Sequence, residues 1–178
     1  MKKKIALIVD ISEQGGPLLA KFLLSKNYVV YGTSRFKLLK NLKKLKIIRK
    51  IKIFQLNTLA YNAIDKIIKK TRCNEIYYLF GQSSVKQSKK LSYETILSNN
   101  LPLVNILECV RKTKKRIKVF NPSSVEIFGK FKKKRRNENS DFDPQNFFAL
   151  SKLISLKIMQ SYRQQFKIWT YTENLKLT

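Results

Sequence analysis

The sequence of 178 residues contains no histidine and only two cysteines, Cys73 and Cys109. Without histidine, neither a Ser-His-Asp nor a Cys-His catalytic arrangement can form. The two cysteines lie 36 positions apart, so they cannot form the Cys-x-x-Cys pair of a structural zinc site. These absences exclude metal centres and acyl-transfer sites of those kinds. We therefore expect both thiols to be small buried or half-buried side chains without chemistry.

Long apolar runs are also missing from the chain. The basic start at residues 1–4 is followed by an apolar run of only five residues, which ends at Asp10 and is too short for a signal peptide. No stretch reaches the roughly 18 to 20 uncharged apolar residues that a membrane span needs. Together with two cysteines that show no sign of pairing, this predicts a cytoplasmic protein that does not contact a membrane.

Acidic residues are few, since 11 Asp and Glu stand against 38 Lys and Arg and leave a formal charge of +27. Such a charge attracts polyanions, and the basic run at residues 132–136 is typical of a phosphate-binding tract. The other basic residues are spread along the whole chain and are not interleaved with aromatic side chains as on a base-stacking surface. This dispersion argues against nucleic acid as the partner. A basic polyanion-binding module stays open as an alternative.

The hydrophobic pattern predicts a parallel α/β fold. Hydrophobic residues make up 43% of the chain, with 11 Phe and 8 Tyr, and the length suits a single domain over residues 1–178. Short apolar runs alternate with longer helical patterns, which is typical of a parallel sheet with crossover helices. We expect strands at residues 5–9, 28–31, 51–56, 76–80, 117–120 and 168–171, and helices at 17–25, 60–71, 93–112 and 147–166. Residues 36–50 suit a basic helix or a loop. Trp169, Tyr77 and Tyr78 are expected in core or strand packing.

Several segments resemble one known family. Residues 4–8 and 19–28 resemble its first strand and helix, and residues 74–79 followed by the sequence GQSSVK resemble its segment EIYNLGAQSHVK. The sequence SSVEIFG at residues 123–129 resembles the family's STSELYG, and FALSKL at residues 148–153 falls on its Tyr-x-x-x-Lys helix. Over most of its length the chain therefore resembles the N-terminal part of GDP-mannose 4,6-dehydratases, which are extended short-chain dehydrogenases/reductases.

This resemblance implies a Rossmann-type, doubly wound and mostly parallel sheet with the strand order 3-2-1-4-5-6. It also implies that the family's C-terminal substrate domain is missing, because the sequence stops just after the sixth strand. Members of the family bind NADP and oxidise C4 of the mannose in GDP-mannose. They then eliminate water across C5 and C6 and return the hydride to C6. The implied substrate is GDP-mannose or a related nucleotide sugar.

Carried over position by position, the resemblance places Ser124 at the hydroxyl that orients the substrate, Glu126 at the acid/base that removes the C5 proton, and Lys152 at the lysine. Phe148 stands in the position of the tyrosine base. Residues four apart share one helix face, which is why this spacing serves the tyrosine and the lysine. Phenylalanine has no hydroxyl, and losing such a general base typically costs about 10² to 10⁴ in rate.

The cofactor contacts that the resemblance implies are Ile11, Gln14, Gly16, Arg35, Asn57, Leu79 and Gly81. Arg35 is expected at the end of the second strand, where a basic residue suits a 2′-phosphate and favours NADP over NAD. The family's Gly-x-x-Gly-x-x-Gly turn reads Asp10, Glu13 and Gly16 here. Each acidic replacement adds a Cβ and a negative charge where the backbone should approach phosphate.

Three hypotheses for the function follow. The first is a dehydratase domain that is inactive or impaired as an isolated chain, with a complementary chain supplying any missing half. The second is a pseudoenzyme scaffold that binds a protein partner, and the third is the basic polyanion-binding module. Because the helices corresponding to residues 93–112 and 147–166 commonly pair between subunits in this superfamily, a homo-oligomer is also expected.

Overall fold

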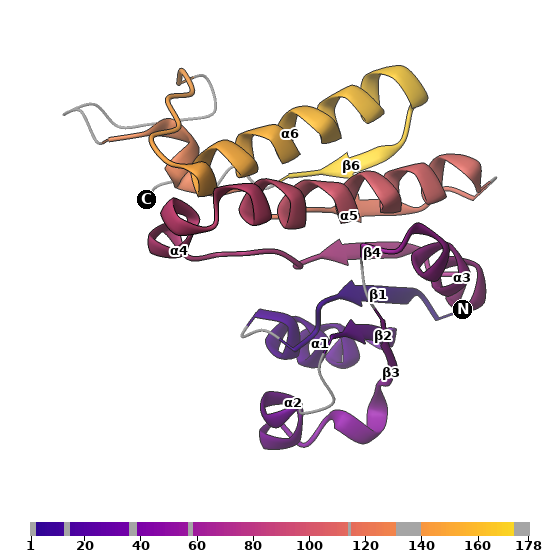
Figure 1. Ribbon diagram of the computed structural model, residues 1–178. Coiled ribbons are helices and arrows are strands. Elements are labelled where there is room, and N and C mark those ends of the chain that lie inside the picture. Colours follow the sequence, from indigo (N-terminus) through magenta and orange to yellow (C-terminus); the bar gives the residue numbers. More distant parts are fainter. Residues whose placement is uncertain are drawn as a thin grey trace.

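The computed structural model describes residues 3–12, 15–35, 39–56, 59–113, 115–130 and 140–172. Strands and helices alternate along the chain (Figure 1). Their bounds are β1 Ile5–Val9, α1 Gly15–Ser25, β2 Val29–Ser34, α2 Lys40–Lys44, β3 Lys52–Gln55, α3 Tyr61–Thr71, β4 Glu75–Tyr78, α4 Val85–Lys90, α5 Ser92–Lys112, β5 Lys118–Phe120, α6 Phe147–Phe166 and β6 Trp169–Tyr171, with 3-10 turns η1 Ile48–Lys50 and η2 Val125–Phe128. In the described part of the chain, no helix is both long and apolar enough to cross a membrane.

The six strands form one parallel sheet in the order β3-β2-β1-β4-β5-β6, as the sequence predicted. The central strand β1 pairs with both β2 and β4, so that Leu7 is in register with Tyr31 on one side and Ile76 on the other. The chain crosses over between β3 and β4, which is where the strand order reverses. In such sheets, ligands bind outside the carboxyl ends of the strands at this reversal.

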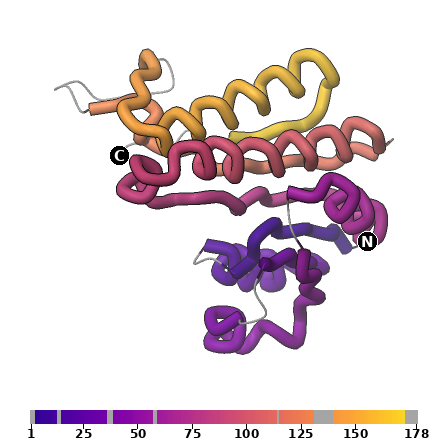
Figure 2. Tube along the Cα trace, in the orientation of Figure 1, coloured from indigo at the N-terminus to yellow at the C-terminus, as the bar shows by residue number. Residues whose placement is uncertain are grey.

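Side chains of β1 alternate between the two faces of the sheet. Leu7 and Val9 pack with Ile67 of α3 and Leu103 of α5, whereas Ile8 packs with residues of α1 and α2 in a separate core. Figure 2 follows the chain through the same arrangement, from β1 in indigo to β6 in yellow. Helices therefore cover both faces of the strands that end at the reversal.

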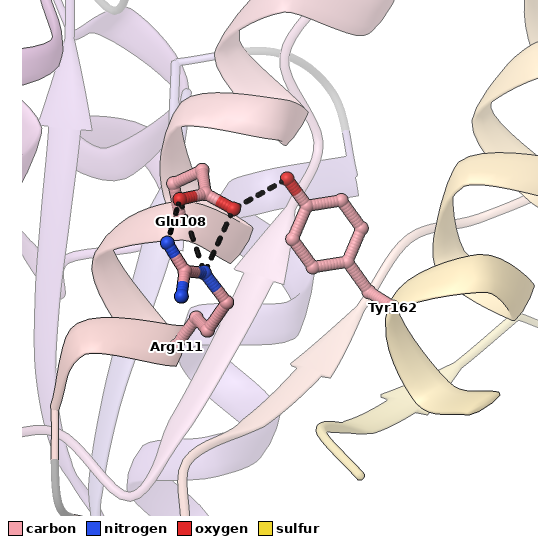
Figure 3. Close-up of polar contacts among 3 residues, drawn as sticks. All are labelled: Glu108, Arg111 and Tyr162. Atoms are coloured by element: carbon pink, nitrogen blue, oxygen red, sulfur yellow. Dashed lines mark hydrogen bonds and ion pairs between the residues drawn. The ribbon is translucent and has the colours of Figure 1, made fainter. Parts of the chain in front are cut away.

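A polar cluster joins α5 and α6, which lie side by side (Figure 3). The Glu108 carboxylate accepts hydrogen bonds from the Tyr162 hydroxyl at 2.8 Å and from Arg111 Nε and Nη2 at 3.0 and 2.8 Å. The hydrogen bonds from Arg111 hold the pKa of Glu108 below its ordinary value. Nearer the start of α6, the Ser155 hydroxyl donates to Asn100 Oδ1 at 2.8 Å. These bonds fix α6 against the rest of the domain.

Residues 36–50 contain both a short helix, α2, and the turn η1, so each of the two expected alternatives is partly realised. Strand β2 continues to Ser34, three residues beyond its predicted end, because polar Thr33 and Ser34 pair with β3 although they interrupt the apolar pattern. Helix α4 was not predicted, and its signal is the N-cap Ser84, whose hydroxyl accepts a hydrogen bond from the Gln87 N–H.

Of the two alternatives expected for Trp169, core or strand packing, the structure shows the strand. Strand β6 is an edge strand, and Trp169 is 46% exposed with the Lys118 ammonium 5.6 Å from its ring centre. Tyr78 is buried as expected, and Cys73 and Cys109 are both free and buried. Burial raises the pKa of each thiol to about 11, which keeps both neutral and unreactive near neutral pH.

Candidate functional site

The carboxyl edge of the sheet gathers the described residues that were expected to bind a cofactor or catalyse. Strands β1, β2, β4 and β5 end there and are followed by Asp10, Arg35, Leu79 and Asn121. The expected residues Ile11, Gly81 and Ser124 lie on the turns that leave these strands. Gly16 lies in the first turn of α1, Glu126 lies in η2, and Phe148 and Lys152 lie on α6. The expected contacts Gln14 and Asn57, the acidic Glu13 and the basic run at residues 132–136 lie outside the described residues.

The turn between β1 and α1 is hydrogen-bonded to β2 and packs closely against the first turn of α1. The Ile11 N–H donates a hydrogen bond to the Thr33 carbonyl at 2.9 Å, so the turn is fixed to β2. A Cβ at Gly16 would lie 2.7 Å from the Ile11 carbonyl oxygen, which is too short for a contact between non-bonded atoms. Only glycine therefore allows this turn, although the other two glycines of the pattern are absent.

Asp10 adopts the left-handed conformation, with φ at 63°, which Asp tolerates better than most residues. Its side chain is only 1% exposed and accepts a hydrogen bond from the Ser12 hydroxyl. The second carboxylate oxygen lies 3.7 Å from Arg35 Nη2. The negative charge of Asp10 is therefore met by Arg35, which offsets the repulsion that the sequence suggested for phosphate.

Arg35 lies over the aromatic ring of Phe80, with 4.6 Å between the guanidinium carbon and the ring centre. Both residues line a cavity of about 390 Å³ together with Gly81 and Gln82. Gly81 has φ at 135°, and a Cβ there would overlap the side-chain oxygen of Asn99. The cavity volume falls within the range of small-molecule sites, about 300 to 1,000 Å³.

Lys152 lies beside Phe148 on one face of α6, as the four-residue spacing predicted. Its ammonium group lies 5.9 Å from the centre of the Phe148 ring and donates a hydrogen bond to the Pro122 carbonyl at 3.2 Å. Burial lowers the pKa of Lys152 to about 8. The lysine is therefore fixed at the end of β5 and stays largely protonated near neutral pH.

Ser124 and Glu126 lie at the start of η2, just after β5. The Ser124 hydroxyl accepts a hydrogen bond from the Glu126 N–H at 3.3 Å. The Glu126 carboxylate accepts from the Asn146 amide at 3.2 Å, and Asn146 in turn caps α6 by accepting from the Ala149 N–H at 2.8 Å. The structure thus ties Glu126 to the helix that carries Phe148 and Lys152.

Buried polar atoms without a hydrogen-bond partner mark the same edge. Within the described residues they are Asp10 Oδ2, Ser98 Oγ, Asn99 Oδ1, Asn121 Oδ1 and Ser123 Oγ. An unsatisfied buried polar atom typically costs about 1 to 3 kcal/mol. A polar ligand that formed hydrogen bonds with these atoms would recover part of this cost, which would favour its binding. Apart from Asp10, the sequence analysis did not identify these residues. Their only signal is polar character within apolar stretches.

Comparisons with known proteins show the family to which the chain belongs. A family sequence model described as GDP-mannose 4,6 dehydratase matches residues 7–176. This chain belongs to that family. A GDP-mannose 4,6 dehydratase from Drosophila melanogaster is 28% identical over 94% of this chain and 45% of its own length, and that from Homo sapiens is 27% identical over 94% and 48%. The chain spans about half the length of the curated relatives it matches.

Solved structures confirm the expected Rossmann-type fold. A UDP-glucose 4-epimerase from Brucella ovis in complex with NAD superposes with a TM-score of 0.85 at 16% identity, covering 95% of this chain and 50% of its own. A dTDP-glucose 4,6-dehydratase from Streptomyces venezuelae with NAD bound also gives 0.85, at 15% identity, with coverages of 94% and 54%. The sheet order is the one that the resemblance to the GDP-mannose 4,6-dehydratase family implied.

Proposed function

We propose that this chain is the dinucleotide-binding part of a nucleotide-sugar dehydratase, and that it binds NADP but is impaired in oxidising GDP-mannose or a related sugar. The observation that carries the proposal is the position of Arg35, whose guanidinium lies over Phe80 at the rim of the 390 Å³ cavity. A basic residue after the second strand is the feature that accommodates a 2′-phosphate in this fold.

The residues at the carboxyl edge fit a nicotinamide dinucleotide. The close contact between Gly16 and Ile11 shapes a turn that precedes α1, and a helix start of this kind receives a pyrophosphate. The unpartnered atoms of Asn121 and Ser123 supply hydrogen-bonding capacity near Lys152. When bound, such a cofactor accepts a hydride and returns it. Arg35 would hold its adenosine end, and the groups after β5 would lie nearer the reacting end.

The impairment follows from Phe148. In the family pattern, a phenolate at this position takes the proton from the sugar hydroxyl while the neighbouring lysine lowers the phenol pKa. Lys152 occupies its position, with its ammonium 5.9 Å from the ring centre, but the ring carries no oxygen. Ser124 and Glu126 are hydrogen-bonded near the start of α6, which supports our proposal that the hydroxyl and carboxylate positions are inherited without the base that starts the reaction.

Titration with NADPH tests the cofactor site, using fluorescence or calorimetry at about 50 and 200 mM salt because a charge of +27 attracts any phosphate nonspecifically. We expect saturable binding that survives the higher salt and weakens about tenfold or more in Arg35→Ala. Arg49→Ala is the matched control, because Arg49 is an exposed arginine on η1 outside this cavity. Equal losses in both variants, or no saturable binding at the higher salt, would refute the proposal.

A second candidate function, a scaffold that binds a protein partner, is favoured by apolar side chains on α5 and α6. Tyr93 is 72% exposed, and Leu101, Phe147 and Leu150 are also exposed on the first halves of these helices. Apolar patches of this kind commonly mark interaction surfaces. We expect light scattering to show a dimer or a complex with a complementary chain. A clean monomer across concentrations would contradict this candidate.

A further inference from the structure

A second, larger cavity lies at the opposite edge of the sheet, where the strands begin. It has a volume of about 660 Å³ and is formed by α3 along its length, the end of α5 and the segment that enters β5. Its lining residues are Tyr61, Asp65, Ile68, Lys69, Arg72, Cys109, Lys112, Thr113, Lys115 and Ile117. None of them belongs to the site described above.

Four cations line this cavity, and a single carboxylate stands against them. Lys69 binds Asp65, the only carboxylate in the lining, at 2.6 Å. The Lys112 ammonium lies 4.9 Å from the centre of the Tyr61 ring. Arg72 and Lys115 form no ion pair with a carboxylate in the part of the chain that the structure describes. The cavity therefore has an excess of positive charge.

Basic residues at the end of a helix often serve only to stabilise its last carbonyl groups. Here other donors already occupy such carbonyls. The Thr71 hydroxyl donates to the Ile67 carbonyl at 2.8 Å, and the Arg72 N–H donates to that of Ile68 at 3.1 Å. At the end of α5, the hydroxyl and the N–H of Thr113 both donate to the Val110 carbonyl. The cationic ends of Arg72 and Lys115 are thus not needed for capping.

The remaining wall of the cavity is apolar. Ile68, Cys109 and Ile117 are almost completely buried beneath it, and Tyr61 adds an aromatic ring. Desolvation raises the pKa of Cys109 to about 11, so this thiol is neutral and behaves as a small apolar side chain. An apolar floor with cations at the rim suits a molecule that has an apolar body and an anionic group.

We infer that this cavity is a second binding site, which takes a small organic phosphate with an aromatic or apolar body. The phosphate contacts Arg72 and Lys115, which present guanidinium and ammonium donors to an oxyanion. The body lies against Ile68, Ile117 and Tyr61. This site is independent of the dinucleotide cleft, because the two lie at opposite edges of the sheet.

The test is a titration of the full chain with 1-naphthyl phosphate, followed by fluorescence anisotropy at about 200 mM salt, where nonspecific attraction is largely screened. Two double variants and one single variant are compared with the parent. Arg72→Gln with Lys115→Gln removes the two cations that are inferred to contact the phosphate, and Arg49→Gln with Lys50→Gln removes the same charges from an exposed turn. Arg35→Gln reports on the dinucleotide cleft.

We expect saturable binding to the parent, about tenfold or more weaker in the Arg72 and Lys115 double variant and unchanged in the other two variants. Inorganic phosphate should bind at least about tenfold more weakly than 1-naphthyl phosphate, because it lacks the apolar body. Equal losses in both double variants would assign the binding to net charge, and a loss in Arg35→Gln would assign it to the other cleft. Either of these results overturns the inference. So does an equal affinity for inorganic phosphate, and so does the absence of saturable binding.

Discussion

The Lys152 ammonium lies 5.9 Å from the centre of the Phe148 ring and donates a hydrogen bond to the carbonyl of Pro122 at 3.2 Å. The lysine is thus placed beside a ring that offers it no oxygen atom. Its position depends on α6, which is tied to α5 through the bond between Asn99 and Ser151 at 2.7 Å and to η2 through Asn146. The geometry of the pair is therefore kept by the fold and does not need the tyrosine.

Phe148→Tyr is expected to create a phenol whose pKa is lowered by the Lys152 charge. Ultraviolet difference titration against the parent isolates this phenol from the other tyrosines. The same substitution in a Lys152→Met background is the control, and we expect the pKa there to be higher by about one unit or more. Equal values in the two backgrounds would show that the lysine does not act on position 148.

Phe148→Tyr alone is not expected to restore dehydration of GDP-mannose in the presence of NADP. Asp10 and Glu13 still stand at two glycine positions of the family's turn, where the resemblance implies a close approach of phosphate. The measurement is formation of the 4-keto-6-deoxy sugar, with the parent as baseline. Activity well above that baseline would mean that the missing phenol is the only important defect.

Lys152→Met should raise the free energy of unfolding near pH 7 by about 1 to 2 kcal/mol, because a buried charge is removed at the expense of one hydrogen bond. Burial lowers the pKa of Lys152 from 10.5 to about 8, so between these values the unfolded chain binds the proton more tightly than the folded chain. The parent therefore gains stability as the pH rises through this window. The advantage of the variant should shrink accordingly.

Urea unfolding at about pH 7 and about pH 9.5 measures this change. Lys157→Met is the matched control, because Lys157 is an exposed lysine on the same helix and its removal changes the net charge equally. We expect the control to show little pH dependence relative to the parent. A constant difference between Lys152→Met and the parent at both pH values would contradict the burial of the charge.

Gly81→Ala should lower the free energy of unfolding by about 2 to 4 kcal/mol, because φ is 135° there and the new Cβ would overlap the Asn99 oxygen. Gly15→Ala is a matched control at the first residue of α1, where nothing lies within 4 Å of an added Cβ. Alanine favours helix, so the control should be neutral or stabilised by up to about 1 kcal/mol. Similar changes in stability for the two substitutions would contradict the predicted clash between a side chain at position 81 and Asn99.

The sheet order and the long helices were predictable because their apolar patterns are strong and the chain resembles a family with a known fold. Strand β2 was predicted too short, since Thr33 and Ser34 take part in the sheet through backbone bonds that hydrophobicity does not reveal. The sequence also left open whether Trp169 packs in the core or only in a strand, and the structure places it exposed on the edge strand β6. Burial at an edge strand depends on what covers it, and the sequence of the strand itself does not show this.

The candidate site was predictable only in part. Motif positions predict Ser124, Glu126 and Lys152 as site residues, which stays a prediction. The sequence could not show that Asp10 turns its carboxylate to Arg35. That pairing requires a left-handed Asp10 and a neighbouring strand, and the two residues are separated by the whole of α1. The unpartnered oxygen of Asn99 was equally hidden, because only the packed helix buries it.

Asp10→Asn is expected to strengthen NADPH binding about threefold to tenfold, on the basis of the proposed cofactor site. The Asp10 carboxylate lies 3.7 Å from Arg35, so it competes with the cofactor phosphate for the guanidinium. Asparagine also tolerates the left-handed conformation, so the turn should be kept. NADH lacks the 2′-phosphate and should gain less. Calorimetric titration of both cofactors at about 200 mM salt gives the two affinities.

Asp65→Asn is the matched control for this last variant, because it removes one carboxylate that pairs with Lys69 far from the cleft. If net charge alone set the affinity, Asp65→Asn and Asp10→Asn would strengthen NADPH binding equally. If Asp10 acts through Arg35, the gain disappears when Asp10→Asn is combined with Arg35→Ala. A gain that persists in this double variant would instead place the effect of Asp10 on the pyrophosphate turn.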